Sequence, residues 1–89
     1  MIGNCDLTAT FKVYHALVDG GLPFAELAER TNLNRVTLSD RLHRMRVRGD
    51  LIHNPDKKRG EYELTQSGYI TIGAYDDAEA WVRDNPFWK

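Results

Sequence analysis

The segment from Thr31 to Ile52 constrains the fold of this chain more than any other. Within it, Leu38, Leu42 and Met45 recur at positions i, i+4 and i+7, which predicts one apolar stripe on a helix running from about residue 35 to residue 47. Because an apolar stripe is stable only when other residues cover it, we expect this helix to pack against a core.

Both ends of this helix carry a local signal. Asn34 stands at the N-cap position, and Gly49 stands where a left-handed residue would end the helix. The side opposite the apolar stripe is expected to be polar and mostly basic. Its expected residues are Arg35, Val36, Thr37, Asp40, Arg41 and Arg44, followed by Arg46 and Arg48 near the C-terminal end.

The formal net charge of −1 is unevenly distributed along the chain. Between Arg35 and Arg59 there are eight Arg or Lys residues and three Asp residues, a local charge of +5, so the other segments total −6. One such cluster is typical of a solvated surface. Two basic clusters, on a helix and on a neighbouring loop, favour a face that meets a polyanion.

A length of 89 residues indicates one small domain, residues 1–89, whose core is marginal unless a partner buries more surface. The sequence contains no run of eighteen apolar residues and no signal-peptide pattern at its start. We therefore expect a soluble cytoplasmic protein without membrane contacts. Cys5, the only cysteine, can form neither an internal disulfide nor a thiolate metal site, and we interpret it as an incidental thiol.

Two helices are expected before the segment described above. The first follows Asp6, an N-cap candidate, and ends before Gly20-Gly21, and the second begins near Pro23. Apolar residues at helical spacing are Leu7, Phe11, Tyr14, Leu17 and Val18 in the first helix, and Leu27 and Ala28 in the second. Residues 31–34 then turn the chain sharply, so that residues 24–47 form a helix-turn-helix.

After Gly49 the pattern changes to that of a β-hairpin. Two short runs, residues 51–53 and 61–64, have strand character, and Pro55-Asp56 and Gly60 between them supply turn residues. Because an isolated hairpin is unstable, Ile52, Tyr62 and Leu64 are expected to lean on the helical core. The basic residues of the tip are Lys57, Lys58 and Arg59. They fit a loop that reaches a phosphate backbone or minor groove, or simply a flexible soluble loop.

The last long segment, residues 66–83, is predicted to form a single further helix with a broad aromatic stripe, although Gly68 and Gly73 weaken it. This helix packs either on the first helix of its own chain or in a two-fold dimer interface. The expected interface residues are Phe11, Tyr14, Tyr69, Ile72, Tyr75 and Trp81. The aromatic tail, residues 85–89, either tucks back onto the core or docks on a neighbour.

Two stretches, LPFAELAERTNLNRVTLSDRLHRMRVRGDLI and EYELTQSGY, resemble the winged helix-turn-helix family, in particular small transcriptional regulators of MarR, ArsR and PadR type. The resemblance covers about Leu22 to Tyr69 and includes the closing "G-x-L-I" and "L-T-x-x-G" patterns. It implies a mainly α fold with a small β-hairpin: a three-helix core, a two-stranded wing and an additional C-terminal helix. The chain departs from the family at Pro23-Phe24, where Ser or Thr is common, and lacks long dimerisation helices.

The resemblance also implies that one side of the third helix enters the major groove of DNA. Arg35 and Arg41 could then donate to guanine and Val36 could contact a thymine methyl, whereas Asp40 could accept from cytosine or orient a neighbouring arginine. The residues implied on this side are Asn34, Arg35, Val36, Thr37, Asp40, Arg41 and Arg44. A two-fold dimer would space two such helices by roughly 34 Å.

Residues for catalysis are not grouped in the sequence. His15, His43 and His53 fall on different expected elements, and the adjacent Asp76 and Asp77 diverge on a helix. Neither a phosphate-binding glycine loop nor a Ser/His/Asp signature is present. We therefore expect no enzyme, no cofactor and no metal site.

The leading hypothesis is a sequence-specific, dimeric, double-stranded DNA-binding regulator from a prokaryote or one of its viruses or plasmids. A related hypothesis is an architectural or recombination factor that bends DNA with the same fold. The third is a winged-helix protein-interaction module, in which the Arg-rich face or the C-terminal aromatic helix and tail bind another protein.

Overall fold

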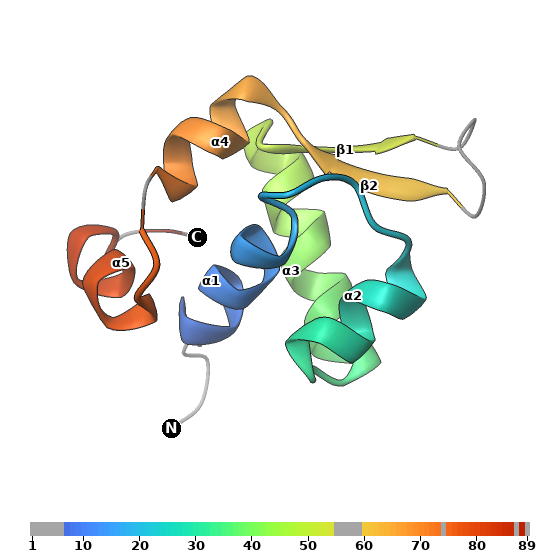
Figure 1. Ribbon diagram of the computed structural model, residues 1–89, viewed down its shortest axis with the longest axis horizontal. Coiled ribbons are helices and arrows are strands. Elements are labelled where there is room, and N and C mark those ends of the chain that lie inside the picture. Colours follow the sequence, from blue (N-terminus) through green and yellow to red (C-terminus); the bar gives the residue numbers. More distant parts are fainter. Residues whose placement is uncertain (1–6, 55–59, 74, 87, 89) are drawn as a thin grey trace.

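The computed structural model describes residues 7–54, 60–73, 75–86 and 88. In these residues the chain is mainly helical with one two-stranded antiparallel hairpin, which confirms the expected mixture of elements (Figure 1). None of the described helices has the length and apolarity needed to cross a lipid bilayer. The elements are α1 (Leu7–Ala16), α2 (Phe24–Thr31), α3 (Arg35–Arg48), β1 (Leu51–Asn54), β2 (Glu61–Leu64), α4 (Gln66–Ile72) and α5 (Ala78–Asp84).

Local signals set both ends of α3. The Asn34 side chain accepts a hydrogen bond of 2.8 Å from the Thr37 backbone N–H, and Gly49 ends the helix in the left-handed conformation with φ 86°. The predicted start and stop are therefore confirmed, and the helix is one residue longer than expected. The preceding helix, α2, ends at Thr31, and its C-cap residue, Asn32, also adopts a left-handed conformation, so the chain turns within a few residues.

The hairpin pairs Leu51 with Leu64 and Asn54 with Glu61 at its two ends. Ile52 was expected to lean on the core, but it is 48% exposed. Successive strand residues point to opposite faces, and it is Leu51, paired with Leu64, that turns inward. The tip, residues 55–59, lies outside the described residues.

The expected single helix over residues 66–83 is wrong, because the structure breaks it in two. Gly73 ends α4 with φ 57° and ψ −139°, a conformation that a helix cannot continue. The chain then turns, and the Asp77 side chain accepts from the Glu79 backbone N–H to start α5. As a result α5 packs on α1 as a separate short helix (Figure 1).

The core surrounds α1, which contacts α2, α3, α4 and α5. Its Tyr14 ring lies 5.8 Å from Trp81 of α5 and 6.2 Å from Trp88, measured between ring centroids. The tail therefore tucks back onto the core at Trp88, one of the two alternatives left by the sequence. The buried apolar residues are Phe11, Val13, Tyr14, Leu17, Leu27, Leu38, Leu42, Met45, Leu51, Leu64, Ile72, Trp81 and Trp88.

This core changes the expected dimer surface. Four of its six predicted residues, Phe11, Tyr14, Ile72 and Trp81, are buried within the single chain. They are unavailable to a partner while the domain is folded, because α4 ends at Gly73 and the separate helix α5 places Trp81 on α1. Of the predicted set, only Tyr69 is exposed and Tyr75 half-buried.

Candidate nucleic-acid interface

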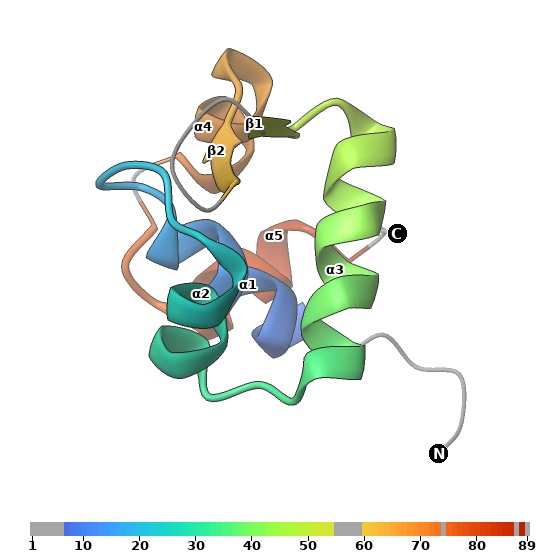
Figure 2. The ribbon, with the colours of Figure 1, turned by 90° about the vertical axis from the view of Figure 1, so that its right-hand side faces the viewer.

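One side of α3 faces away from the rest of the molecule, and no other described helix or strand covers it (Figure 2). We call this side the outer face of α3; it comprises Val36, Ser39, Asp40, His43 and Arg46. These residues lie at spacings of three or four, as on one face of a helix, and opposite the buried Leu38, Leu42 and Met45. The Val36 side chain is the most accessible large apolar group described, at 80% exposure.

Two depressions follow this face. The first has a volume of about 560 Å³ and is lined by Arg35, Val36, Ser39, Asp40 and His43. The second, of about 170 Å³, lies between α3 and the hairpin and is lined by Ser39, Leu42, His43, Arg46 and Tyr62. Helix and hairpin thus form one continuous surface.

Stacked rings hold the hairpin side of this surface. The His53 and Tyr62 rings lie 4.4 Å apart and nearly parallel, at 18°. The His53 Nε2 atom lies 3.0 Å from the Gly60 carbonyl oxygen, and Tyr62 exchanges two backbone hydrogen bonds with Leu22 ahead of α2. The hairpin is therefore tied both across its own strands and to the segment that leads into α2.

Asp40 organises two of the arginines of α3. Its Oδ2 atom accepts from Arg41 Nη1 at 2.5 Å and from Arg44 Nε at 3.0 Å. The pair with Arg44 has the i, i+4 spacing that brings side chains together on a helix. Of the two roles that the sequence left open for Asp40, the orientation of a neighbouring arginine is the one seen here.

The other three arginines of α3 differ in their contacts. Arg48 pairs with Asp50 at 3.4 Å between Nε and Oδ2. The Arg35 guanidinium lies 5.8 Å from the centre of the Phe24 ring. Arg35 and Arg46 are exposed and have no ion pair with a described residue. These two are the cations of α3 most available to an external anion.

Arg41 does not lie on the exposed side, contrary to expectation: it is 7% exposed. The sequence contained the signal for this, because Arg41 is three residues after Leu38 and four before Met45, the spacing of residues on the same face. Its long side chain is buried at the edge of the core while Nη1 reaches Asp40. A direct contact between Arg41 and a base is therefore incompatible with this arrangement.

The remaining predicted contact residues fall into three groups. Asn34, Arg35 and Val36 are exposed, although Asn34 Oδ1 is used by the helix cap. Thr37, Asp40 and Arg44 are half-buried. Lys57, Lys58 and Arg59 lie outside the described residues.

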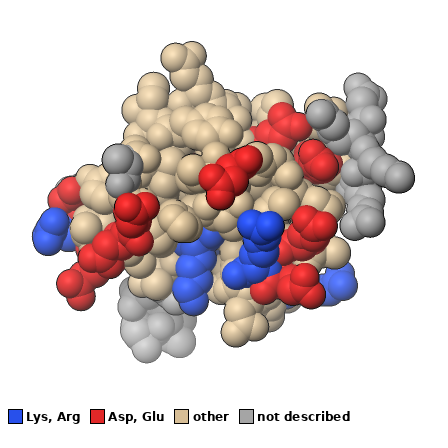
Figure 3. Space-filling view, in the orientation of Figure 1, with Lys and Arg blue, Asp and Glu red and all other residues tan. Residues whose placement is uncertain are grey.

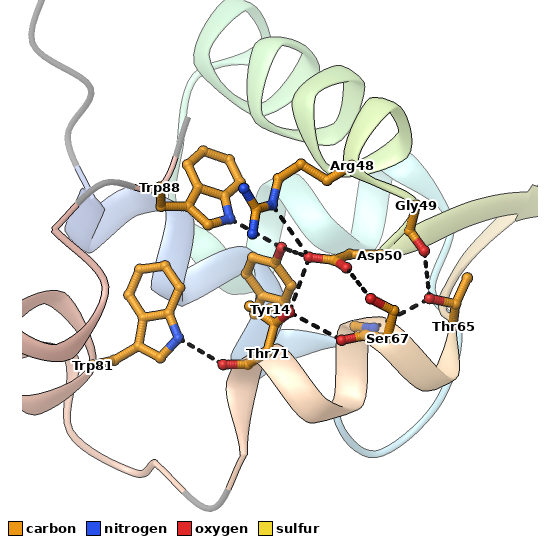
Figure 4. Close-up of polar contacts among 10 residues, drawn as sticks. Tyr14, Arg48, Gly49, Asp50, Thr65, Ser67, Thr71, Trp81 and Trp88 are labelled. Atoms are coloured by element: carbon orange, nitrogen blue, oxygen red, sulfur yellow. Dashed lines mark hydrogen bonds and ion pairs between the residues drawn. The ribbon is translucent and has the colours of Figure 1, made fainter.

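Sequence reasoning missed the polar side chain with the most hydrogen-bond partners among residues 7–54, 60–73, 75–86 and 88, the carboxylate of Asp50 (Figure 4). Asp50 is 2% exposed and accepts hydrogen bonds from the Tyr14 hydroxyl, from Ser67 Oγ at 2.8 Å and from Thr71 Oγ1 at 3.1 Å. Burial, and then the hydrogen bond to Asp50, raise the pKa of Tyr14 above its usual value of 10.0. In sequence Asp50 follows Gly49 and resembles any turn residue, so no local signal marks it.

The same network reaches the C-terminal segment. Trp88 Nε1 donates to the Tyr14 hydroxyl oxygen at 3.2 Å, and the Arg48 guanidinium lies 5.2 Å from the centre of the Trp88 ring (Figure 4). Asp50 follows α3, Tyr14 lies on α1 and Trp88 lies in the tail. Hydrogen bonds among these three residues therefore join α3, α1 and the tail. This network positions α3 relative to the core.

Other surfaces offer less to a polyanion. On the face drawn in Figure 3, separate groups of acidic side chains alternate with basic ones, and α4 carries no charged residue. A pocket of about 510 Å³ between α1 and α2 has both Lys12 and Arg30 and the acidic Asp19 on its lining. Neither surface combines an uncovered helix with unpaired arginines as α3 does.

The described residues hold no group of three or more His, Cys, Asp or Glu arranged to bind a metal ion. His15, His43 and His53 lie on α1, α3 and β1 respectively. No model of a known protein family matches this chain, and no curated protein matches it. The outer face of α3 and the adjoining hairpin are therefore the features from which a function can be inferred.

Proposed function

We propose that this protein binds double-stranded DNA as a winged helix-turn-helix transcriptional regulator, with α3 in the major groove and the hairpin as the wing. One observation carries the proposal: α3 has 14 residues, is capped at both ends, and presents an outer face that no described element covers (Figure 2). A major groove about 12 Å wide admits a helix of this kind.

The chemistry of the outer face supports the proposal. Arg35 and Arg46 are exposed cations suited to phosphates or guanine, and Ser39 and His43 bring hydrogen-bonding groups. The exposed Val36 side chain suits the methyl group of thymine. Together these groups provide both positioning and base-edge contacts.

The hairpin supports it as well. β1 and β2, which a loop of residues 55–59 connects in the sequence, project beyond the helices (Figure 1). Lys57, Lys58 and Arg59 belong to that loop in the sequence, and three neighbouring cations suit a phosphate backbone or a minor groove.

We further propose a two-fold dimer on a palindromic site, with the two α3 helices roughly 34 Å apart. Its interface cannot use the four aromatic and aliphatic residues already buried in the core. The surface of α4, which includes the exposed Tyr69, is the part of the predicted interface that remains free.

The test is binding of the purified protein to random duplex DNA and to the DNA upstream of its own gene, measured by fluorescence anisotropy across a salt series. We expect affinity to fall with salt with a log–log slope of about −0.9 per neutralised phosphate, and to be higher on the upstream DNA. Cooperative binding to phased sites with bending would identify an architectural factor instead. If the protein bound no DNA even at low salt, the protein-interaction module would be the remaining hypothesis.

A double variant locates the site. Replacing both Arg35 and Arg46 by Ala should weaken binding to every sequence and reduce the magnitude of the salt slope by about 2, because two phosphate contacts are lost. Arg83→Ala is the matched control, since Arg83 is an exposed arginine on α5, at the other end of the molecule from the hairpin (Figure 1). If the double variant and the control lost DNA affinity equally, the binding site would lie elsewhere.

A further inference from the structure

We infer that Arg44 reads a guanine base and that Asp40 holds Arg44 in the orientation needed, an inference that rests on the DNA binding proposed above. Asp40 is then a positioning residue, and Arg41 fixes Asp40 from the core side. The three residues form a chain of contacts that runs from the buried side of α3 to its surface.

The contact between Asp40 and Arg44 uses only the Nε–H of the Arg44 guanidinium and leaves its two Nη atoms available. Asp40 Oδ2 takes the Arg44 Nε–H at 3.0 Å, and the Arg44 side chain is 40% exposed. No described residue accepts from the two Nη atoms of Arg44. Those two nitrogens form the planar fork that donates to O6 and N7 of guanine.

Arg41 supplies the fixed end of this chain. Its side chain is 9% exposed, so packing restricts its rotamers, and Nη1 donates to the same Asp40 oxygen. A buried charge is stable only with a partner, which Asp40 provides. A side chain held in its binding orientation before DNA arrives loses less entropy on binding.

Asp40 lies on the outer face of α3. This position favours a role in orienting Arg44 over a role that depends only on the negative charge of Asp40. A carboxylate beside DNA repels phosphates and lowers affinity for every sequence. Such a group is useful where it improves discrimination between bases. Arg46, on the same face, has no carboxylate partner among the described residues, so it is suited to a phosphate contact and serves as a comparison.

The experiment is selection of binding sites from a duplex pool with a randomised central segment, followed by affinity measurements on the selected site and on single-base changes. Wild-type protein should select guanine at one position of each half-site. Arg44→Lys keeps the charge but loses the fork, so preference for that guanine should fall by roughly 5- to 150-fold while binding to random duplex stays within about twofold. The matched control, Arg46→Lys, should retain the preference.

Asp40→Ala tests positioning directly. We expect the guanine preference to fall while binding to random duplex is unchanged or stronger, because a repelling charge has been removed. Equal strengthening on selected and altered sites would show that Asp40 acts only through its charge and would overturn the inference. Far-ultraviolet circular dichroism establishes that the variant is folded; if it is not, Arg44→Lys decides the question, because it leaves Asp40 and Arg41 paired.

The outcomes separate this inference from the proposed function. If wild-type protein binds no duplex DNA, the proposed function fails. If it binds specifically but Arg44→Lys keeps every guanine preference, or Arg46→Lys abolishes the same one, only the reading role of Arg44 is overturned.

Discussion

At the scale of single residues, the carboxylate of Asp50 shows how a buried charge is accommodated. Burying an ionised group is costly unless hydrogen bonds replace its water, and three hydroxyl groups from Tyr14, Ser67 and Thr71 do so here. The donors come from α1 and α4, so satisfying one side chain also fixes two helices against the end of α3.

The first prediction concerns Tyr14 and alkaline pH. Because the folded state raises the pKa of Tyr14, the unfolded chain releases this proton near pH 10 while the folded chain keeps it. The free energy of unfolding should therefore fall as the pH rises above about 10, by up to about 1.4 kcal/mol per pH unit from this group. Below about pH 10 the full stabilising contribution of the Tyr14 hydroxyl is present. Urea unfolding at pH 9 to 11.5 measures it.

Tyr14→Phe isolates this effect. The variant should be less stable at pH 9 by about 1–3 kcal/mol, because Asp50 and Trp88 lose a partner, and its stability should fall less above pH 10 than that of wild type. Tyr69→Phe, which removes an exposed hydroxyl, is the control. If the free energies of unfolding of wild type and Tyr14→Phe fell equally with rising pH, the role given to Tyr14 would be contradicted.

At the scale of elements, the start of α4 depends on close backbone contact. Thr65 Oγ1 accepts from the Gly68 backbone N–H at 3.1 Å and donates to the Gly49 carbonyl at 2.7 Å, so one side chain caps α4 and binds the end of α3. The Gly68 backbone lies against the Asp50 carbonyl, and an added Cβ would be 2.2 Å from that oxygen. The pattern L-T-x-x-G thus has a physical cause in this chain.

The second prediction is that Gly68→Ala destabilises the protein. Helix propensity alone favours Ala by about 1 kcal/mol, but overpacking against backbone typically costs about 1–3 kcal/mol and the neighbour here is a carbonyl that cannot rotate away. We expect a net loss of stability in urea unfolding. Gln66→Ala, at an exposed position of the same helix, should be nearly neutral. A stabilised Gly68→Ala protein would refute the close contact.

At the scale of the whole molecule, the C-terminal part closes the core. Trp81 and Trp88 both pack on Tyr14, and Trp88 also covers the Arg48 guanidinium. An 89-residue chain has a small core, and these two indole rings supply much of its aromatic area. Aromatic residues that looked like a dimer surface are therefore used to complete the monomer.

The third prediction is that Trp88→Ala lowers the free energy of unfolding by about 3–5 kcal/mol, the usual cost of removing a buried indole. Trp88 is 5% exposed although it stands next to the last residue of the chain. Chemical denaturation measures the change, and Pro86→Ala, an exposed position in the same tail, is the control. A loss below about 1 kcal/mol would mean that the tail contributes little to the core.

The sequence by itself determined the elements that depend on local spacing and capping. Leu38, Leu42 and Met45 defined the buried stripe of α3, Asn34 and Gly49 defined its ends, and two short runs of strand character predicted the paired strands of the hairpin. These signals act between residues a few positions apart, so they can be read along the chain. The burial of Arg41 could also have been predicted, because its spacing from Leu38 and Met45 is equally local.

Only the tertiary structure decided which residues far apart in sequence meet. Tyr14, Asp50, Ser67, Thr71 and Trp88 converge from separate elements, and nothing in their local sequence specifies that convergence. The assignment of the aromatic residues to the core also depended on where Gly73 turned the chain. A side chain that is apolar or able to form hydrogen bonds fits many partners. Only the folded geometry selects one of them, so long-range packing decides which distant residues meet.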